Sequence, residues 1–170
     1  MEYRFETVWK NQTPALLDEI IAFWTKEKAL NTEEQAQQRA KQSVVVMRDE
    51  KGDIAAVSTA IARVLPRLRQ PMFYYRSFCA EAHRGQHTST PMMKACQKAL
   101  HEYVLGMDKP IAIGIIIEIE NKMLREHYKQ ANWPALFSFI GYSPRELPIY
   151  AHYFPEMELM PPVKAKARKA

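Results

Sequence analysis

The stretch that decides the fold reads SFCAEAHRGQHTSTPMM and spans residues 77–93. It follows the aromatic run MFYY at residues 72–75, whose residue types suit a buried strand. After it, apolar residues recur at spacings of three and four, as on one face of a helix: Met92, Cys96, Ala99, Leu100, Tyr103 and Val104. We therefore predict a strand, a loop and a helix. The first amides of such a helix lack intrahelical partners and carry partial positive charge, and Arg84 adds a full charge, so the loop suits a phosphate group.

Two residues set the predicted start of this helix. Pro91 fits the first helical position, because its ring fixes φ at a helical value and its nitrogen has no hydrogen to leave unpaired. Thr90 is then the N-cap, whose hydroxyl accepts a hydrogen bond from the first turn.

The loop resembles the pyrophosphate-binding motif of the GNAT superfamily of N-acetyltransferases, which reads Arg/Gln-x-x-Gly-x-Gly/Ala after the central strand. Arg84 holds the first position, and Ser89 is a small residue at the last. His87 stands where the family prefers glycine. The resemblance implies that the loop amides hold the pyrophosphate of coenzyme A, over Arg84, Gly85, Gln86, His87, Thr88 and Ser89. It also implies that the end of the strand flanks the pantetheine arm, at Ser77, Phe78 and Cys79.

The resemblance extends to a second motif. Asn121 follows a predicted strand over residues 111–119, and Tyr128 lies seven residues further on. Seven residues are two helical turns, so we expect both side chains on nearly one face of a helix. The resemblance implies that Asn121 fixes the turn from strand to helix at the cofactor site, and that Tyr128 protonates the departing sulfur. A phenol pKa near 10 resembles that of an alkyl thiol, which suits this transfer, and a packing role for Tyr128 is the alternative.

Carboxylates near this motif are candidates for the general base. Glu118 and Glu120 point to the same side of their predicted strand, because side chains alternate along a strand. Glu81, at the end of the central strand, is a third candidate. A structural ion pair, surface exposure or a water chain in place of any carboxylate remains open for each of them. The histidines lack metal-ligand spacing, so we predict no metal.

The remaining elements complete the predicted fold. They are a strand over 3–8, a helix beginning at Thr13 and Pro14, a polar surface helix over about 31–42, hairpin strands over 44–47 and 54–59, and a closing strand pair over 139–142 and 149–154. The resemblance covers about residues 3–155. It implies an α+β fold of the GNAT type, with a mixed, mostly antiparallel sheet of about seven strands and about four helices on both faces. Residues 129–140 are an insertion relative to the family.

Length and composition bound the other expectations. A chain of 170 residues is long enough for one domain, which we predict over residues 1–160, followed by a basic, disordered tail over 161–170. No apolar run approaches the roughly 20 residues that span a bilayer, and the first residues lack the pattern of a signal peptide. We expect a cytoplasmic protein without a membrane partner. The two cysteines, Cys79 and Cys96, are expected as buried free thiols.

The net charge of +5 belongs mostly to the tail. Four of the 24 basic residues lie in the last seven positions. The rest of the chain has 20 basic and 19 acidic side chains, so its net charge is about +1. A nucleic-acid partner is therefore not expected, except through the tail. A homodimer is left open.

These observations predict an acyl-CoA-dependent N-acetyltransferase that uses acetyl-CoA as cosubstrate and an amine as acceptor. The alternative is a GNAT-like module that binds coenzyme A or another protein without catalysis. The acceptor's identity is not predicted, because loops build such pockets.

Overall fold

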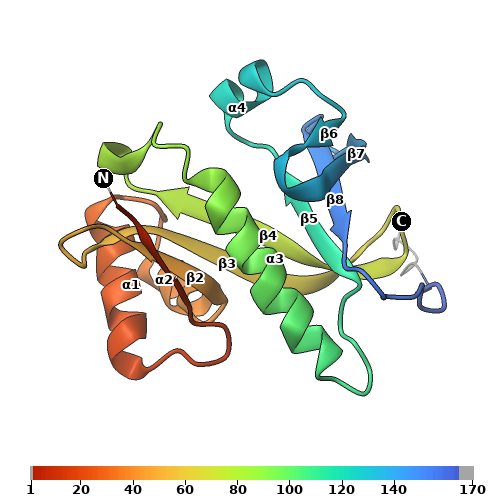
Figure 1. Ribbon diagram of the computed structural model, residues 1–170, viewed down its shortest axis with the longest axis horizontal. Helices are drawn as coiled ribbons and strands as arrows, with labels where there is room; N and C mark the ends of the chain where they lie inside the picture. The colour runs from red at the N-terminus through yellow and green to blue at the C-terminus, as the bar shows by residue number, and fades with distance from the viewer. Residues whose placement is uncertain (1, 165–170) are drawn as a thin grey trace. The chain divides into compact units, whose positions relative to one another are not determined.

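The structure is a computed structural model that describes residues 2–164. Its elements follow one another along the chain as Figure 1 shows: β1 Arg4–Thr7, α1 Pro14–Lys26, α2 Glu33–Ala40, β2 Ser43–Arg48, β3 Ile54–Leu65, β4 Gln70–Cys79, the 3-10 turn η1 Glu81–His83, α3 Ser89–Leu105, β5 Gly114–Glu118, α4 Lys122–His127, β6 Asn132–Trp133, the 3-10 turn η2 Pro134–Leu136, β7 Phe137–Tyr142 and β8 Pro148–Tyr153.

Within the described residues, eight strands form one sheet in the order β1-β2-β3-β4-β5-β8-β7-β6. β4 and β5 run parallel, with Phe73 opposite Ile115, whereas the pairs β1–β2, β2–β3, β5–β8, β8–β7 and β7–β6 are antiparallel. The predicted α+β fold with a mixed, mostly antiparallel sheet is confirmed. The sheet has one strand more than expected, because the segment 129–140 contributes the two-residue strand β6.

The chain divides into two compact units, each with its own hydrophobic core. The first comprises Met1–Ala60 and Tyr75–Glu102, and the second comprises Ile61–Tyr74 and Tyr103–Ala170. β3 and β4 contribute residues to both units. A single domain over residues 1–160 stays a prediction.

In the first unit, α1 begins where the sequence predicts. The Thr13 hydroxyl oxygen accepts a hydrogen bond from the Leu16 amide at 3.2 Å, and Pro14 is the first helical residue. The missing amide hydrogen of Pro14 costs nothing there, because the first-turn amides have no intrahelical acceptor. The helix is thereby fixed at its start and buries one apolar face: Ile20, Phe23 and Trp24.

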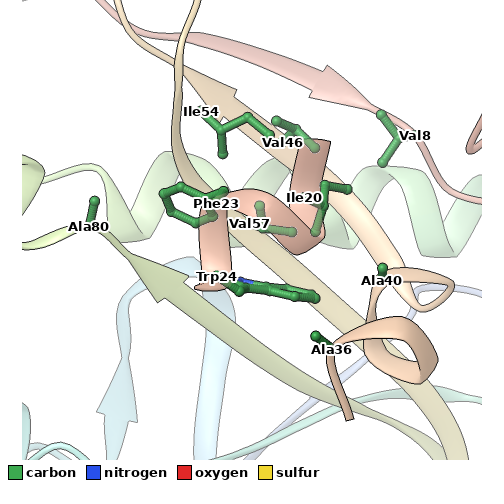
Figure 2. Packing of buried hydrophobic residues seen from close by; sticks show 10 residues of the cluster. All are labelled: Val8, Ile20, Phe23, Trp24, Ala36, Ala40, Val46, Ile54, Val57 and Ala80. Carbon is green, nitrogen blue, oxygen red and sulfur yellow. The ribbon is translucent and has the colours of Figure 1, made fainter. Parts of the chain in front are cut away.

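The core of the first unit lies between α1, α2 and the strands β2 and β3 (Figure 2). Trp24 is 2% exposed and Ile20 is fully buried. α2 is polar, as predicted, and contributes only the small side chains of Ala36 and Ala40. It ends at Ala40, two residues before the predicted end, and the Thr32 hydroxyl caps its start by accepting from the Gln35 amide at 3.2 Å.

The predicted hairpin between β2 and β3 is confirmed. Asp49 Oδ1 accepts hydrogen bonds from the amides of Lys51 and Asp53 at 2.9 and 3.0 Å. Gly52 has φ +89°, a conformation that favours glycine. The turn therefore holds the Asp49 carboxylate in a fixed orientation.

In the second unit, β5 is shorter than the predicted strand over 111–119. It spans Gly114–Glu118, and Ile111 is 39% exposed. Three successive isoleucines, Ile115 to Ile117, are buried, so both faces of the strand are covered as expected. Gly114 is required by close packing, because a Cβ there would lie 2.3 Å from the carbonyl oxygen of His152 on β8.

The predicted closing strand pair is β7 and β8 (Figure 1). β6 pairs only with Phe137 and Ser138 of β7. Further along β7, the guanidinium of Arg67 donates hydrogen bonds to the carbonyl oxygens of Ile140 and Tyr142 at 3.1 and 2.9 Å. Gly141 lies between them, and a Cβ at this position would overlap the Arg67 guanidinium.

The end of the described chain is bonded to the β3–β4 turn. The Gln70 side chain donates to the Met160 carbonyl oxygen at 2.8 Å and accepts from the Met160 amide at 2.9 Å. The Val163 amide donates to the Arg69 carbonyl oxygen at 3.0 Å. The beginning of the predicted tail, 161–164, is thus held at Val163, whereas residues 165–170 lie outside the described residues.

Candidate active site

The loop predicted to bind phosphate lies between β4 and α3, in the first unit. β4 ends at Cys79, and η1 follows at Glu81–His83. α3 begins at Ser89. Tyr103 of the predicted apolar set is only partly buried, whereas the other five residues are buried: Met92, Cys96, Ala99, Leu100 and Val104. Strand, loop and helix therefore follow one another as predicted.

The predicted helix start is wrong by two residues. The Met92 amide donates to the Thr88 carbonyl oxygen at 3.0 Å, so Thr88 rather than Thr90 precedes the first helical residue. Pro91 is the third residue of α3. The helix tolerates it there, because the amides of the first turn have no intrahelical acceptor that proline would forfeit.

Two residues of the loop have a left-handed backbone. Gly85 has φ +77° and His87 has φ +55°. Position 87, where the related motif prefers glycine, therefore does adopt the conformation that glycine favours. This conformation destabilises an L-residue such as histidine by about 1–2 kcal/mol, because its Cβ lies too close to the following carbonyl oxygen.

Four of the loop amides are available to a ligand. Of the five backbone amides from Gly85 to Ser89, that of Gln86 closes a hydrogen-bonded turn over Arg84 and Gly85, and no group in residues 2–164 accepts a hydrogen bond from the other four. These four donors precede and open a helix of 17 residues, whose dipole adds partial positive charge. Such an arrangement can bind a phosphate or pyrophosphate group.

The strand end before the loop is tied to Arg84. The Arg84 Nε donates to the Cys79 carbonyl oxygen at 3.1 Å, and the Arg84 guanidinium lies 5.9 Å from the centre of the Phe78 ring. Phe78 also contacts Phe23 of α1 edge to face. Burial raises the pKa of the half-buried Cys79 thiol, so this thiol stays protonated near neutral pH. Ser77, the remaining residue predicted at the strand end, is exposed.

Three side chains from distant parts of the first unit meet at η1. Tyr3 Oη lies 3.0 Å from His83 Nδ1, and their rings are edge to face. On the other side of the imidazole, Nε2 lies 3.9 Å from Asp49 Oδ2. Burial raises the pKa of the Tyr3 hydroxyl, with further contributions from Cys79 and from the acidic side chains Asp49 and Glu50. The phenol is therefore protonated near neutral pH.

In the second unit, Asn121 fixes the start of α4. Its Oδ1 accepts a hydrogen bond from the Leu124 amide at 3.1 Å. The helix has only six residues, and Tyr128 follows it with φ −108° and ψ 94°. The expectation that Asn121 and Tyr128 share one helical face is therefore wrong, because the helix ends at His127.

Tyr128 is part of a row of aromatic rings. It contacts His127 and Trp133 edge to face, with ring centres 4.9 and 5.3 Å away. Trp133, from β6, stacks on Tyr150 of β8, and Tyr150 contacts Phe139 of β7. The segment 129–140 thus sets the surroundings of Tyr128 through Trp133.

Both predicted base candidates of this unit contact one arginine. Arg145 Nη2 lies 3.1 Å from Glu118 Oε1 and 2.8 Å from Glu120 Oε1. The prediction that both lie on one strand is wrong, because β5 ends at Glu118 and Glu120 follows it, although one guanidinium nitrogen reaches both side chains. The hydrogen bond to Glu120, and to a lesser extent the one to Glu118, raises the pKa of the Arg145 guanidinium. Glu81, the third candidate, is exposed in η1 of the other unit.

No group of three histidine, cysteine or acidic side chains within the described residues could hold a metal ion. Membrane-spanning helices are likewise not found in the described part of the chain, where every helix is too short or too polar to cross a bilayer.

Comparison with solved structures identifies the fold. A phosphinothricin acetyltransferase of the GNAT superfamily from Sinorhizobium meliloti, solved with acetyl-CoA, superposes with a TM-score of 0.58 at 13% identity, covering 96% of each chain. A GNAT-family acetyltransferase from Listeria monocytogenes gives 0.54 at 18% identity, covering 90% of this chain and 95% of that one. One from Streptococcus pneumoniae gives 0.54 at 12% identity, covering 88% and 96%. No protein-family model and no curated protein sequence matches the chain.

The chain has the GNAT fold. The resemblance that rested on short motifs thus extends to the order and pairing of the strands. At these identities the likeness concerns the fold alone, so the roles of the individual site residues depend on the geometry of each unit.

Within the GNAT fold, the first unit carries every predicted cofactor residue except Asn121, and the second carries Asn121, Tyr128, Glu118 and Glu120. Sequence reasoning missed Arg145 as the partner of both carboxylates. It also missed the contact of Tyr3 with His83, since the two are 80 positions apart and neither stands in a recognisable motif.

Proposed function

We propose that this chain is an acyl-CoA-dependent N-acetyltransferase, which moves the acetyl group of acetyl-CoA directly to a primary amine. The observation that carries the proposal is the loop from Gly85 to Ser89, with four unbonded amides before and at the start of α3 in a chain of GNAT fold. The amides would bind the pyrophosphate, as helix starts bind anions. Acetyl-CoA would supply the activated thioester acetyl group.

The cofactor residues have separate tasks in this proposal. Gly85, Gln86, His87, Thr88 and Ser89 contribute backbone donors, and Arg84 contributes charge beside them. Ser77, Phe78 and Cys79 flank the pantetheine arm through backbone groups of β4. Asn121 fixes the start of α4 by capping it. Protein residues thereby bind and orient the donor, which lowers the entropic cost of the transfer.

Tyr128 is the proposed acid. It would give its hydroxyl proton to the departing thiolate sulfur as the bond between sulfur and the acetyl carbon breaks. The acceptor nitrogen must lose a proton, and Glu118 or Glu120 is the proposed base, directly or through water. Arg145 contacts both carboxylates, so the acceptor or the water would have to approach a carboxylate that is already paired with a guanidinium.

The test measures thiol release from acetyl-CoA with and without a mixture of primary amines, together with calorimetric binding of acetyl-CoA. Amine-dependent thiol release supports the enzyme. No measurable binding of acetyl-CoA would overturn the cofactor assignment. A neighbour in the structural comparison is a phosphinothricin acetyltransferase, so phosphinothricin belongs in the mixture as one amine among several.

A catalytically inactive module that binds coenzyme A is the second candidate. Two observations favour it: Arg145 occupies both candidate bases, and Tyr128 lies beyond the end of α4, packed between His127 and Trp133. Binding of acetyl-CoA without amine-dependent thiol release would decide for the module. A cytoplasmic location and a homodimer remain proposals.

A further inference from the structure

The side chains of Tyr3, His83 and Asp49 have no task in the function proposed above. Tyr3 precedes β1, Asp49 lies in the β2–β3 turn and His83 ends η1, one residue before Arg84. The side chains of His83 and Asp49 are only 16% and 15% exposed. Three elements of the first unit thus converge on the residue from which the phosphate loop departs.

We propose that His83 is a positioning residue for the pyrophosphate, held by Tyr3 and Asp49 so that the following amides keep their arrangement. This inference rests on the proposed function, because it concerns the same loop. His83 touches no part of the cofactor in this proposal and acts through the backbone that follows it.

The bonding around the imidazole is consistent with a rigid anchor. The Tyr3 hydroxyl lies 3.0 Å from Nδ1, and Asp49 Oδ2 lies 3.9 Å from Nε2 on the other side of the ring. Asp49 is not free to turn away, because the Lys51 and Asp53 amides hold its other oxygen. The imidazole is therefore fixed from both sides.

The backbone passes this constraint to the loop. The His83 amide donates to the Ala80 carbonyl oxygen at 3.0 Å, and the Ala80 amide donates to the Ala55 carbonyl oxygen at 2.9 Å. Arg84 is also bonded, through its amide to the Glu81 carbonyl oxygen at 3.2 Å and through Nε to the Cys79 carbonyl oxygen at 3.1 Å, and α3 begins at Ser89. Since the amides of His87, Thr88 and Ser89 donate to no described group, the arrangement of this part of the loop depends on the turn at η1 and on the start of α3.

An anchor of this kind affects affinity through the population of the binding-competent loop. If only a fraction of molecules holds the loop in place, the apparent dissociation constant rises by the inverse of that fraction. Loss of one hydrogen bond of the anchor corresponds to roughly a two- to tenfold change. The effect is confined to ligands that contain the pyrophosphate.

The experiment compares two acetyl donors, acetyl-CoA and S-acetylpantetheine, which lacks the pyrophosphate and the nucleotide. Affinity for each is measured by titration with the wild type, Tyr3→Phe and His83→Ala. Tyr3→Phe removes one hydroxyl and retains the ring that packs on His83, so it serves if His83→Ala does not fold. Tyr153→Phe is the matched control, since Tyr153 is 47% exposed and lies on β8 in the other unit.

We expect Tyr3→Phe to weaken acetyl-CoA binding roughly two- to tenfold and to leave S-acetylpantetheine binding unchanged. The loss of acetyl-CoA affinity should be larger in Tyr3→Phe than in Tyr153→Phe. Equal weakening of both donors, or no weakening of acetyl-CoA binding, would overturn the positioning role while leaving the proposed function in place. If the wild type binds no acetyl-CoA, the proposed function fails and this inference fails with it.

Discussion

Replacing His87 by glycine tests whether the phosphate loop carries backbone strain. His87 has φ +55°, a conformation that costs an L-residue about 1–2 kcal/mol and glycine almost nothing. Glycine also makes the unfolded chain more flexible, which costs about 0.4–1 kcal/mol. The difference predicts that His87→Gly raises the free energy of unfolding by up to about 1.6 kcal/mol, which corresponds to at most roughly 3–6 °C in melting temperature for a chain of this size.

The neighbouring residue provides the control. Gln86 is not among the described residues with positive φ, so Gln86→Gly removes no strain and should lower the melting temperature. Both variants are compared with the wild type by calorimetry in the absence of ligand, so that binding does not enter. If His87→Gly lowers the melting temperature as much as Gln86→Gly does, the strain argument is refuted.

Three further predictions concern the acid, an ion pair and the end of the chain. Tyr128→Phe should lower turnover at least ~10-fold with little loss of acetyl-CoA affinity, because it removes only the proton donor. Glu19→Gln should lower the free energy of unfolding at pH 7 by at most about 1 kcal/mol, since the Glu19 side chain that pairs with Arg48 is 44% exposed and solvent screens the pair. Hydrogen bonding to Arg48 lowers the pKa of Glu19, so this stabilisation is present above the unfolded-state pKa and is lost as the pH falls through the folded-state pKa. Deleting 164–170 should leave the melting temperature unchanged, whereas deleting 160–170 should lower it by several degrees, because the hydrogen bonds of Gln70 to Met160 are lost.

Matched variants separate these effects from general damage. Tyr142→Phe removes another hydroxyl of the second unit and should retain full turnover; unchanged turnover in Tyr128→Phe would reassign Tyr128 to packing. Asp18→Asn removes an exposed charge next to Glu19 and should not reproduce the pH-dependent loss of stability. For the chain end, equal melting temperatures of the two truncated forms would show that the contacts of Met160 contribute nothing measurable.

Local signals predicted the elements well where the deciding residues are neighbours in sequence. Thr13 and Pro14 set the start of α1, and Gly52 marks the turn of the hairpin. The start of α3 was mispredicted because Thr88 and Thr90 are both suitable caps, and Pro91 is tolerated anywhere in the first turn. Local preference does not decide between two such caps.

The candidate site was predictable in composition but less so in geometry. The loop residues and the cap Asn121 were identified from spacing and family resemblance. The sequence did not predict that α4 ends before Tyr128. Beyond this end, Tyr128 packs against Trp133, a residue of the insertion 129–140. The shared partner of Glu118 and Glu120 was also missed, since Arg145 lies 27 and 25 positions away and no motif announces the pairing.

The contact of Arg67 with β7 bears on whether a further strand can pair along that side of the sheet. A strand whose carbonyl groups are unpaired offers a template to any extended chain in solution, including another copy of itself. Because β6 covers only Phe137 and Ser138, the carbonyls of Ile140 and Tyr142 would be such a template. The guanidinium of Arg67 occupies both acceptors, and the absence of a side chain at Gly141 makes room for it. One arginine thus takes the place of a ninth strand, and its charge discourages the approach of an intermolecular one.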